Sequence, residues 1–129
     1  MGMKTTIESK QAPAPIGPYS QAVKSGNFVF LSGQIALDPA TGELVMDTLE
    51  NETHRVMQNI REVLSAAGCS FDDVVKTSIF LSDMNHFARV NAVYGSYFSS
   101  EFPARETVQV AGLPKNVNVE ISVIAVCNA

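Results

Sequence analysis

The residues best suited to chemistry in this sequence are an arginine and a glutamate near its carboxyl end, Arg105 and Glu120. A guanidinium group can grip a small organic acid through two parallel hydrogen bonds. A carboxyl group nearby can take up or release a proton, or act on a water molecule. The two residues could equally form a solvated surface pair, worth about 0–1 kcal/mol. The pattern alone leaves both interpretations open.

Two β-strands are predicted to carry this pair, at 105–111 and 117–127, because both segments are rich in β-branched residues. The short loop between them predicts that they pair as a hairpin. Since alternate residues of a strand point to opposite sides, one face would carry Arg105, Thr107, Gln109, Asn118, Glu120 and Ser122. In this register Glu120 lies opposite Gln109, about 13 Å along the strand from Arg105. We therefore expect the arginine and the glutamate to share a face that points away from the helices.

Two helices are expected on the other face of the sheet. Apolar residues recur every three or four positions over 48–67, and a shorter stripe of this kind runs over 85–98. Asp47 and Glu50 resemble a capping box at the start of the first helix, and Gly68 ends it. The remaining strands are expected at 20–24, 28–32 and 74–81, with room for one more at 5–8. The order β-β-α-β-α-β-β indicates an α+β domain, a mixed sheet with two helices on one face.

The segment Phe28–Leu31 is apolar without alternation. Such a strand is typical of a position covered on both faces. We expect a helix on one side and a partner subunit on the other.

Length and charge limit the class of protein. The 129 residues suit a single domain over 1–129, with Met1 and Gly2 a remnant before a natural start at Met3. The formal net charge of −4 argues against a nucleic-acid partner. No apolar run approaches the roughly 20 residues that cross a bilayer, so no membrane partner is expected.

The cysteines and histidines give no sign of a metal site. Cys69 and Cys127 belong to no CxxC motif and are interpreted as small apolar side chains in a cytoplasmic protein. His54 and His86 lie on separate elements, without the spacing of metal ligands. We therefore expect no metal.

Several separate motifs resemble the RidA family (reactive intermediate deaminase A, also called YjgF/UK114). They are Ala14-Pro15-Ile16-Gly17-Pro18-Tyr19-Ser20-Gln21-Ala22, Leu31-Ser32-Gly33-Gln34-Ile35, Val90-Asn91-Ala92, Phe102-Pro103-Ala104-Arg105, Leu113-Pro114-Lys115 and Val119-Glu120-Ile121. The resemblance covers nearly the whole chain in the right order.

The resemblance implies a chorismate-mutase-like α+β fold assembled as a homotrimer around a barrel-like core, with sites in the clefts between subunits. It implies hydrolysis of reactive 2-imino acids, or of enamine tautomers such as 2-aminoacrylate, to 2-oxo acids and ammonia without a cofactor. The activity would be that of a 2-iminobutanoate/2-iminopropanoate deaminase. The alternatives are a metabolite sensor that binds a 2-oxo acid without turnover, and a translation-inhibiting ribonuclease or holdase chaperone. The acidic composition counts against the ribonuclease.

The resemblance also implies roles for individual residues. Arg105 matches the arginine that binds the substrate carboxylate, and Glu120 matches the acidic residue that positions or activates water. Thr107 stands where many deaminase members have cysteine, and is taken as a further substrate-binding residue. The residues that match the lining of the cleft are Tyr19, Ser32, Gly33 and Asn91.

Overall fold

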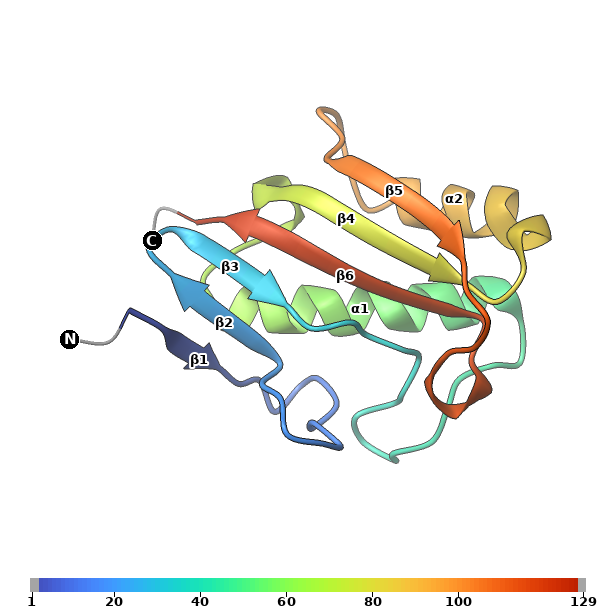
Figure 1. Cartoon of the computed structure of the whole chain (residues 1–129), viewed down its shortest axis with the longest axis horizontal. Helices are drawn as coiled ribbons and strands as arrows, with labels where there is room; N and C mark the ends of the chain where they lie inside the picture. Colours follow the sequence, from blue (N-terminus) through green and yellow to red (C-terminus); the bar gives the residue numbers. More distant parts are fainter. Residues whose placement is uncertain (1–2, 128–129) are drawn as a thin grey trace.

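The structure is a computed structural model that describes residues 3–127; the expected remnant at Met1–Gly2 lies outside them. The chain forms β1 (Thr5–Ile7), β2 (Ala22–Ser25), β3 (Phe28–Leu31), α1 (Leu49–Ala66), β4 (Val74–Leu81), α2 (Phe87–Gly95), β5 (Ala104–Gln109) and β6 (Val119–Val126) (Figure 1). Short 3-10 turns lie at η1 (Phe71–Asp73), η2 (Met84–His86) and η3 (Pro114–Asn116). None of the helices among the described residues has the length and apolar character of a membrane span.

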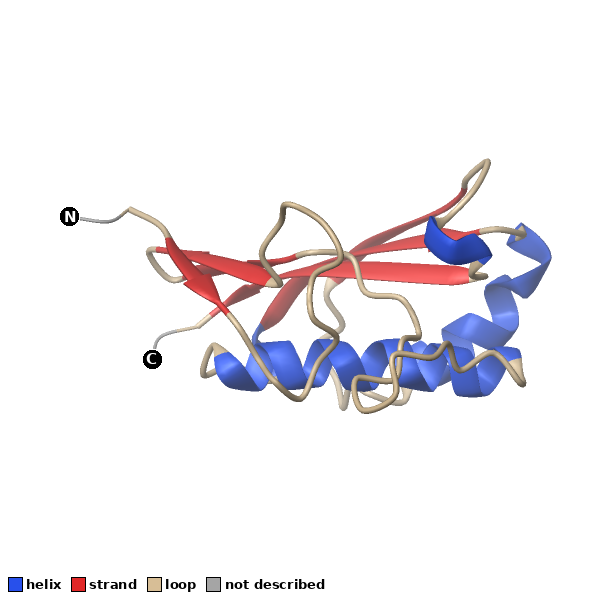
Figure 2. Ribbon diagram, turned by 90° about the horizontal axis from the view of Figure 1, so that it is seen from below, coloured by secondary structure: helices blue, strands red, loops and turns tan. Residues whose placement is uncertain are grey.

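A six-stranded mixed sheet, ordered β1-β2-β3-β6-β4-β5, forms one layer. Strands β4 and β5 run parallel, whereas the other neighbours are antiparallel. Both α-helices lie on the same side of this sheet (Figure 2). The predicted α+β class, a mixed sheet with two helices on one face, is confirmed.

The predicted hairpin between the last two strands is wrong, because β4 lies between β5 and β6. Thr77 of β4 pairs with Arg105 of β5 on one side and with Val123 of β6 on the other. The α2 crossover makes β5 parallel to β4, and the chain then returns to insert β6 inside the sheet. Burial explains this order: Val119, Ile121, Val123 and Ala125 of β6 are all buried. The polar β5 is better suited to an edge.

The expected common face of Arg105 and Glu120 is also wrong. Residues paired across neighbouring strands point to the same side of a sheet. Arg105 therefore points to the helix side, with the buried Thr77. Glu120 pairs with Phe80, which pairs with Val108, so these three side chains lie on the open side. One chain thus places its arginine and its glutamate on opposite faces of the sheet.

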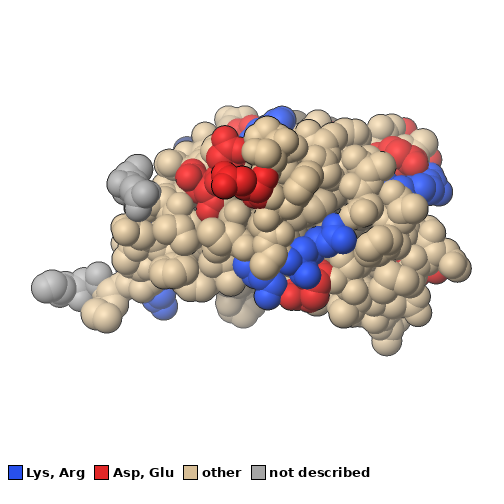
Figure 3. All heavy atoms as spheres, turned by 90° about the horizontal axis from the view of Figure 1, so that it is seen from above, with Lys and Arg blue, Asp and Glu red and all other residues tan. Residues whose placement is uncertain are grey.

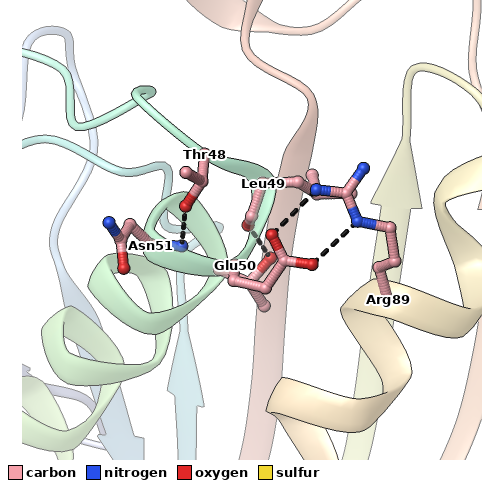
Figure 4. A network of polar contacts seen from close by, with 6 residues as sticks. Thr48, Leu49, Glu50, Asn51 and Arg89 are labelled. Atoms are coloured by element: carbon pink, nitrogen blue, oxygen red, sulfur yellow. Dashed lines mark hydrogen bonds and ion pairs between the residues drawn. The ribbon is translucent and has the colours of Figure 1, made fainter.

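Helix α1 packs the predicted apolar stripe against the sheet; Val56, Met57, Ile60, Val63 and Leu64 are fully buried. Its N-cap is Thr48, whose side chain accepts a hydrogen bond from the backbone N–H of Asn51 at 3.0 Å, so the expected cap at Asp47 is displaced by one residue (Figure 4). Glu50 instead pairs with Arg89 of α2 through two hydrogen bonds of 2.7 and 2.8 Å. This bond to Arg89 lowers the pKa of Glu50 to about 2. Gly68 ends the helix with a φ of +82°.

The open face of the sheet exposes aromatic side chains. Val29 and Leu31 of β3 are buried under the helices, as expected for one face. Phe28 and Phe30 are 49% and 44% exposed, and their rings stack at 6.1 Å. No element of the described chain covers these rings. The second layer that was expected to pack on this strand is therefore not supplied by the same chain.

Cys69 and Cys127 form a disulfide between the loop after α1 and the end of β6, with 5.7 Å between their Cα atoms. Both residues are buried, as the sequence suggests, but they are paired rather than separate. Asp73 lies close to both sulfurs. Since the disulfide uses both sulfurs, this group leaves a metal ion only the carboxylate of Asp73.

Candidate functional site

Arg105 is held in a cage made by one face of α2. Its Nη1 donates a hydrogen bond to Oδ1 of Asn91. Its Cζ lies 5.4 Å from the ring centroid of Phe87 and 5.3 Å from that of Tyr94. Residues three and four apart on a helix lie on one face, and an aromatic ring attracts a cation placed over it. The cage fixes the guanidinium group while most of its N–H donors remain available.

Tyr94 ties this cage to the sheet. Its ring is buried, and its hydroxyl donates a hydrogen bond to Oγ1 of Thr77 at 3.1 Å. Thr77 is the residue beside Arg105 in the neighbouring strand. Burial raises the pKa of Tyr94, so the ring stays neutral under the guanidinium. The helix and the strand therefore hold Arg105 from two directions.

A cavity of about 460 Å³ opens in front of Arg105. Arg105 and Asn91 supply its polar end, and Tyr94, Phe102 and Pro103 supply apolar surface. Pockets for small ligands commonly combine a mostly apolar lining with a few placed polar groups. This cavity can hold a small organic acid with its carboxylate on the arginine.

Thr107 belongs to the same side of the sheet as Arg105. It lies two residues further along β5 and pairs with the buried Ile79. Its Oγ1 is buried and finds no hydrogen-bond partner among residues 3–127. A buried hydroxyl of this kind is free to bond a ligand or a water molecule.

Glu120 occupies the open face, directly against Gly33. A Cβ atom at Gly33 would lie 2.7 Å from Oε2 of Glu120, so only glycine allows this approach. The next residue, Ile121, exchanges two backbone hydrogen bonds with Gln34, of 2.8 and 3.1 Å. Burial raises the pKa of Glu120 above that of an ordinary glutamate. A carboxyl group in this state is suited to proton transfer.

Tyr19 and Ser32 lie on the loops beside Gly33. The Tyr19 hydroxyl accepts a hydrogen bond from the backbone of Ile16 at 3.4 Å, and Ser32 donates one to the carbonyl of Ser20 at 2.7 Å. Tyr19 and Gly33 line a second cavity of about 140 Å³. Tyr19 and Ser32 therefore lie near Gly33 and the Glu120 carboxyl group that contacts it.

Gln21 keeps the proline-rich loop in place. Its buried side-chain amide donates to the carbonyl of Pro13 at 2.8 Å and accepts from the N–H of Ser9 at 2.6 Å. The sequence predicts this loop, but not its anchor.

Sequence reasoning also misses Phe87 and Tyr94 as site residues, because their positions indicate only a buried stripe. Phe87 lies four residues before Asn91 and Tyr94 lies three residues after it. This spacing is the signal that could have placed both rings at the site.

The structure brings the expected site residues together in two sets. Arg105, Asn91 and Thr107 lie on the helix side of the sheet. Glu120 and Gly33, with Tyr19 and Ser32 on the neighbouring loops, form the other set. Within one chain the two sets do not meet.

Comparison with known proteins identifies the family. The family model described as endoribonuclease L-PSP matches residues 9–127. RidA from an Antarctic Psychrobacter has a crystal structure that covers 95% of this chain and 98% of its own, with a TM-score of 0.91 and 45% identity. The chain belongs to the RidA family.

Other members of the RidA family carry different names. A RutC family protein of Pyrococcus horikoshii is 51% identical over 95% of this chain and 98% of its own length. The mouse 2-iminobutanoate/2-iminopropanoate deaminase is 47% identical over 96% of this chain and 92% of its own. The structure of a putative endoribonuclease from Thermotoga maritima has a TM-score of 0.95 and 52% identity, covering 98% and 100% of the two chains. Relatives of this chain in the RidA family are therefore described under several different names.

Proposed function

We propose that this chain hydrolyses reactive 2-imino acids to 2-oxo acids and ammonia, as a 2-iminobutanoate/2-iminopropanoate deaminase. The observation that carries the proposal is the caged guanidinium of Arg105 at the polar end of a cavity. A guanidinium group that is already held in place can bind a carboxylate through paired hydrogen bonds with little loss of side-chain conformational freedom. The name of the mouse relative supports 2-iminobutanoate and 2-iminopropanoate as substrates. The enamine 2-aminoacrylate is a tautomer of 2-iminopropanoate and would be hydrolysed through it.

The reaction needs water at one carbon and a series of proton transfers. Water adds to C2 of the iminium form while Glu120 accepts one of its protons, which gives a neutral carbinolamine. Glu120 then returns that proton to the nitrogen. The C–N bond breaks as the hydroxyl oxygen forms the carbonyl and gives its proton to Glu120, so that ammonia and the 2-oxo acid are released. Glu120 finally passes this proton to ammonia, which leaves as ammonium. The C2 carbon of an iminium is already electrophilic, so placement supplies several kcal/mol of the barrier reduction. An acid–base group adds about 10²–10⁴-fold.

We infer that the complete site forms between subunits of a homotrimer. Arg105 and Glu120 lie on opposite faces of one sheet, so a single chain cannot apply both to one substrate. A second copy could bring the partner subunit's Glu120 to the Arg105 cavity. The exposed Phe28 and Phe30 support such an assembly, since apolar surface of this kind is typical of an interface.

The charge distribution gives the ribonuclease alternative little support. The chain has nine Lys and Arg against thirteen Asp and Glu. On the face that Figure 3 shows, basic atoms form short groups beside acidic ones rather than one continuous field. A phosphate backbone is bound mainly by an extended basic surface.

The proposal is tested by adding the purified protein to a threonine dehydratase reaction, which releases the imine. Faster formation of ammonia and 2-oxo acid is expected, and Arg105→Ala and Glu120→Ala are expected to abolish the acceleration. Binding of a 2-oxo acid without acceleration would indicate a sensor. RNA cleavage that survives in Arg105→Ala would point to the ribonuclease alternative or to a contaminating nuclease.

A further inference from the structure

One fully buried carboxylate lies outside both cavities. Glu52, in the first turn of α1, has 0% of its surface exposed. Its Oε2 accepts hydrogen bonds from the backbone N–H of Asn118 at 2.8 Å and of Val119 at 3.3 Å. Its Oε1 accepts from Nδ2 of Asn118 at 2.8 Å. A buried carboxylate is stable only with such donors, and the helix N-terminus adds to its stabilisation.

Asn118 is also tied to the end of β4. Its carbonyl accepts from the N–H of Ser82 at 3.0 Å, and its Oδ1 accepts from Oγ of Ser82 at 3.3 Å. Glu52 and Ser82 together bond both backbone polar groups and both side-chain polar atoms of Asn118. The start of β6 is therefore fixed to α1 and to β4 at one point.

Glu120 lies between this point and a second one. On the far side, Ile121 exchanges two backbone hydrogen bonds with Gln34. Val119, bonded to Glu52, precedes Glu120 directly. The backbone that carries Glu120 is thus held on both sides, and its carboxyl group is held against Gly33.

We propose that Glu52 is a positioning residue, which orients the Glu120 carboxyl group by anchoring Asn118 and Val119 at the entry of β6. The inference rests on the proposed role of Glu120 in imine hydrolysis. An apolar residue of similar size at position 52 would leave three N–H groups without their partner and free the strand to shift. A displacement of about 1 Å at a reacting group can cost 10²-fold in rate.

The test compares two variants of Glu52 with a buried neighbour whose hydroxyl bonds within the helix rather than to β6. Glu52→Leu is expected to lower kcat for imine hydrolysis by about 10- to 100-fold while KM changes little, because Arg105 still binds the carboxylate. Thr53→Val is the matched control. Thr53 is also fully buried in α1, but its hydroxyl bonds only to the carbonyl of Leu49 within the helix. This variant is expected to lose stability and to keep kcat.

Glu52→Gln is expected to restore most of kcat. The glutamine oxygen can accept both backbone N–H groups, and its NH₂ can meet Oδ1 of Asn118 once that amide turns over. If Glu52→Leu does not fold, Asn118→Ala removes the side-chain donor to Glu52 and the side-chain acceptor of Ser82, and keeps both backbone N–H bonds to Glu52. It is expected to lower kcat in the same direction by a smaller factor, and an unchanged kcat there would overturn the proposal.

A second measurement does not depend on turnover. Titration of ¹³C-labelled glutamate carboxyl groups by NMR, assigned with Glu120→Gln, follows the pKa of Glu120 directly. In Glu52→Leu this pKa should fall toward the ordinary value as the group swings into water, whereas Thr53→Val should leave it raised. An unchanged titration and kcat in Glu52→Leu would reduce Glu52 to a structural role. If the wild type hydrolyses no imine, the proposed function fails. The titration then still tests whether Glu52 positions the Glu120 carboxyl group.

Discussion

Arg105 and Glu120 of one chain lie on opposite faces of the same sheet, with strand β4 between the strands that carry them. Each side chain is positioned by its own set of contacts. Arg105 is caged by Asn91 and two aromatic rings, whereas Glu120 is partly desolvated against Gly33. A reaction that uses both must take them from two copies of the chain.

Gly33→Ala tests the close approach to Glu120. The added Cβ would lie 2.7 Å from Oε2, so the carboxyl group must turn away. We expect kcat to fall by about 10²-fold, since the acid–base group is displaced. Gly112→Ala is the control, because a Cβ there meets nothing within 4 Å. Equal steady-state rates for the two variants would contradict the role assigned to this contact.

Tyr94→Leu tests the cage around Arg105. Loss of a cation–π contact worth roughly 0.5–2 kcal/mol should raise KM about 2- to 30-fold. Tyr94→Phe keeps the ring and removes only the hydrogen bond to Thr77, so its KM should stay near that of the wild type. The measurement is KM for an imine generated at known concentration. A larger change in Tyr94→Phe than in Tyr94→Leu would show that the ring is not what holds Arg105.

The pH dependence of stability tests the burial of Glu120. Its pKa is raised in the folded state from 4.5, so it favours folding at acid pH, and this contribution is lost as the pH rises through the folded pKa. Glu120→Gln cannot ionise and should therefore be more stable than the wild type at neutral pH. Urea denaturation from pH 4 to 8 would measure the difference. A gain that shrinks as the pH rises would have the wrong sign for a raised pKa.

The disulfide between Cys69 and Cys127 predicts a dependence on reducing agent. It closes a loop of 58 residues, which corresponds to about 4 kcal/mol of stabilisation by the chain-entropy model. A phosphine reductant should lower the urea midpoint of the wild type. The double variant Cys69→Ser, Cys127→Ser should not respond to it. If mass spectrometry of the freshly purified protein showed two free thiols, the pairing would be absent in solution.

The sequence predicts local elements of this fold well. The stripe of α1 and the strands β2, β3 and β4 follow from residue patterns within each segment. The cap at Thr48 instead of Asp47 is a shift of one residue, decided by which side chain reaches the N–H of Asn51.

What the sequence does not predict depends on contacts between distant segments. The insertion of β6 between β3 and β4 decides which face of β5 is covered, and no local pattern shows it. The polar residues Arg105 and Thr107 suggest an exposed face, yet their pairing with Thr77 and Ile79 turns them to the helix side, where Arg105 lines a cavity. Glu52 lies four residues before Val56 in the buried stripe, but its partners at Asn118 and Val119 are 66 and 67 residues away.

The most direct test of a site shared between subunits mixes two variants, each of which lacks one of the two groups. Arg105→Ala and Glu120→Ala are unfolded together in equal amounts, refolded, and assayed for imine hydrolysis. If each site takes its arginine from one subunit and its glutamate from the next, random mixing gives both intact groups at about one quarter of the sites. The mixture is then expected to recover about a quarter of wild-type activity, while each variant refolded alone recovers none. A mixture that assembles into trimers and stays inactive would contradict a site shared between subunits.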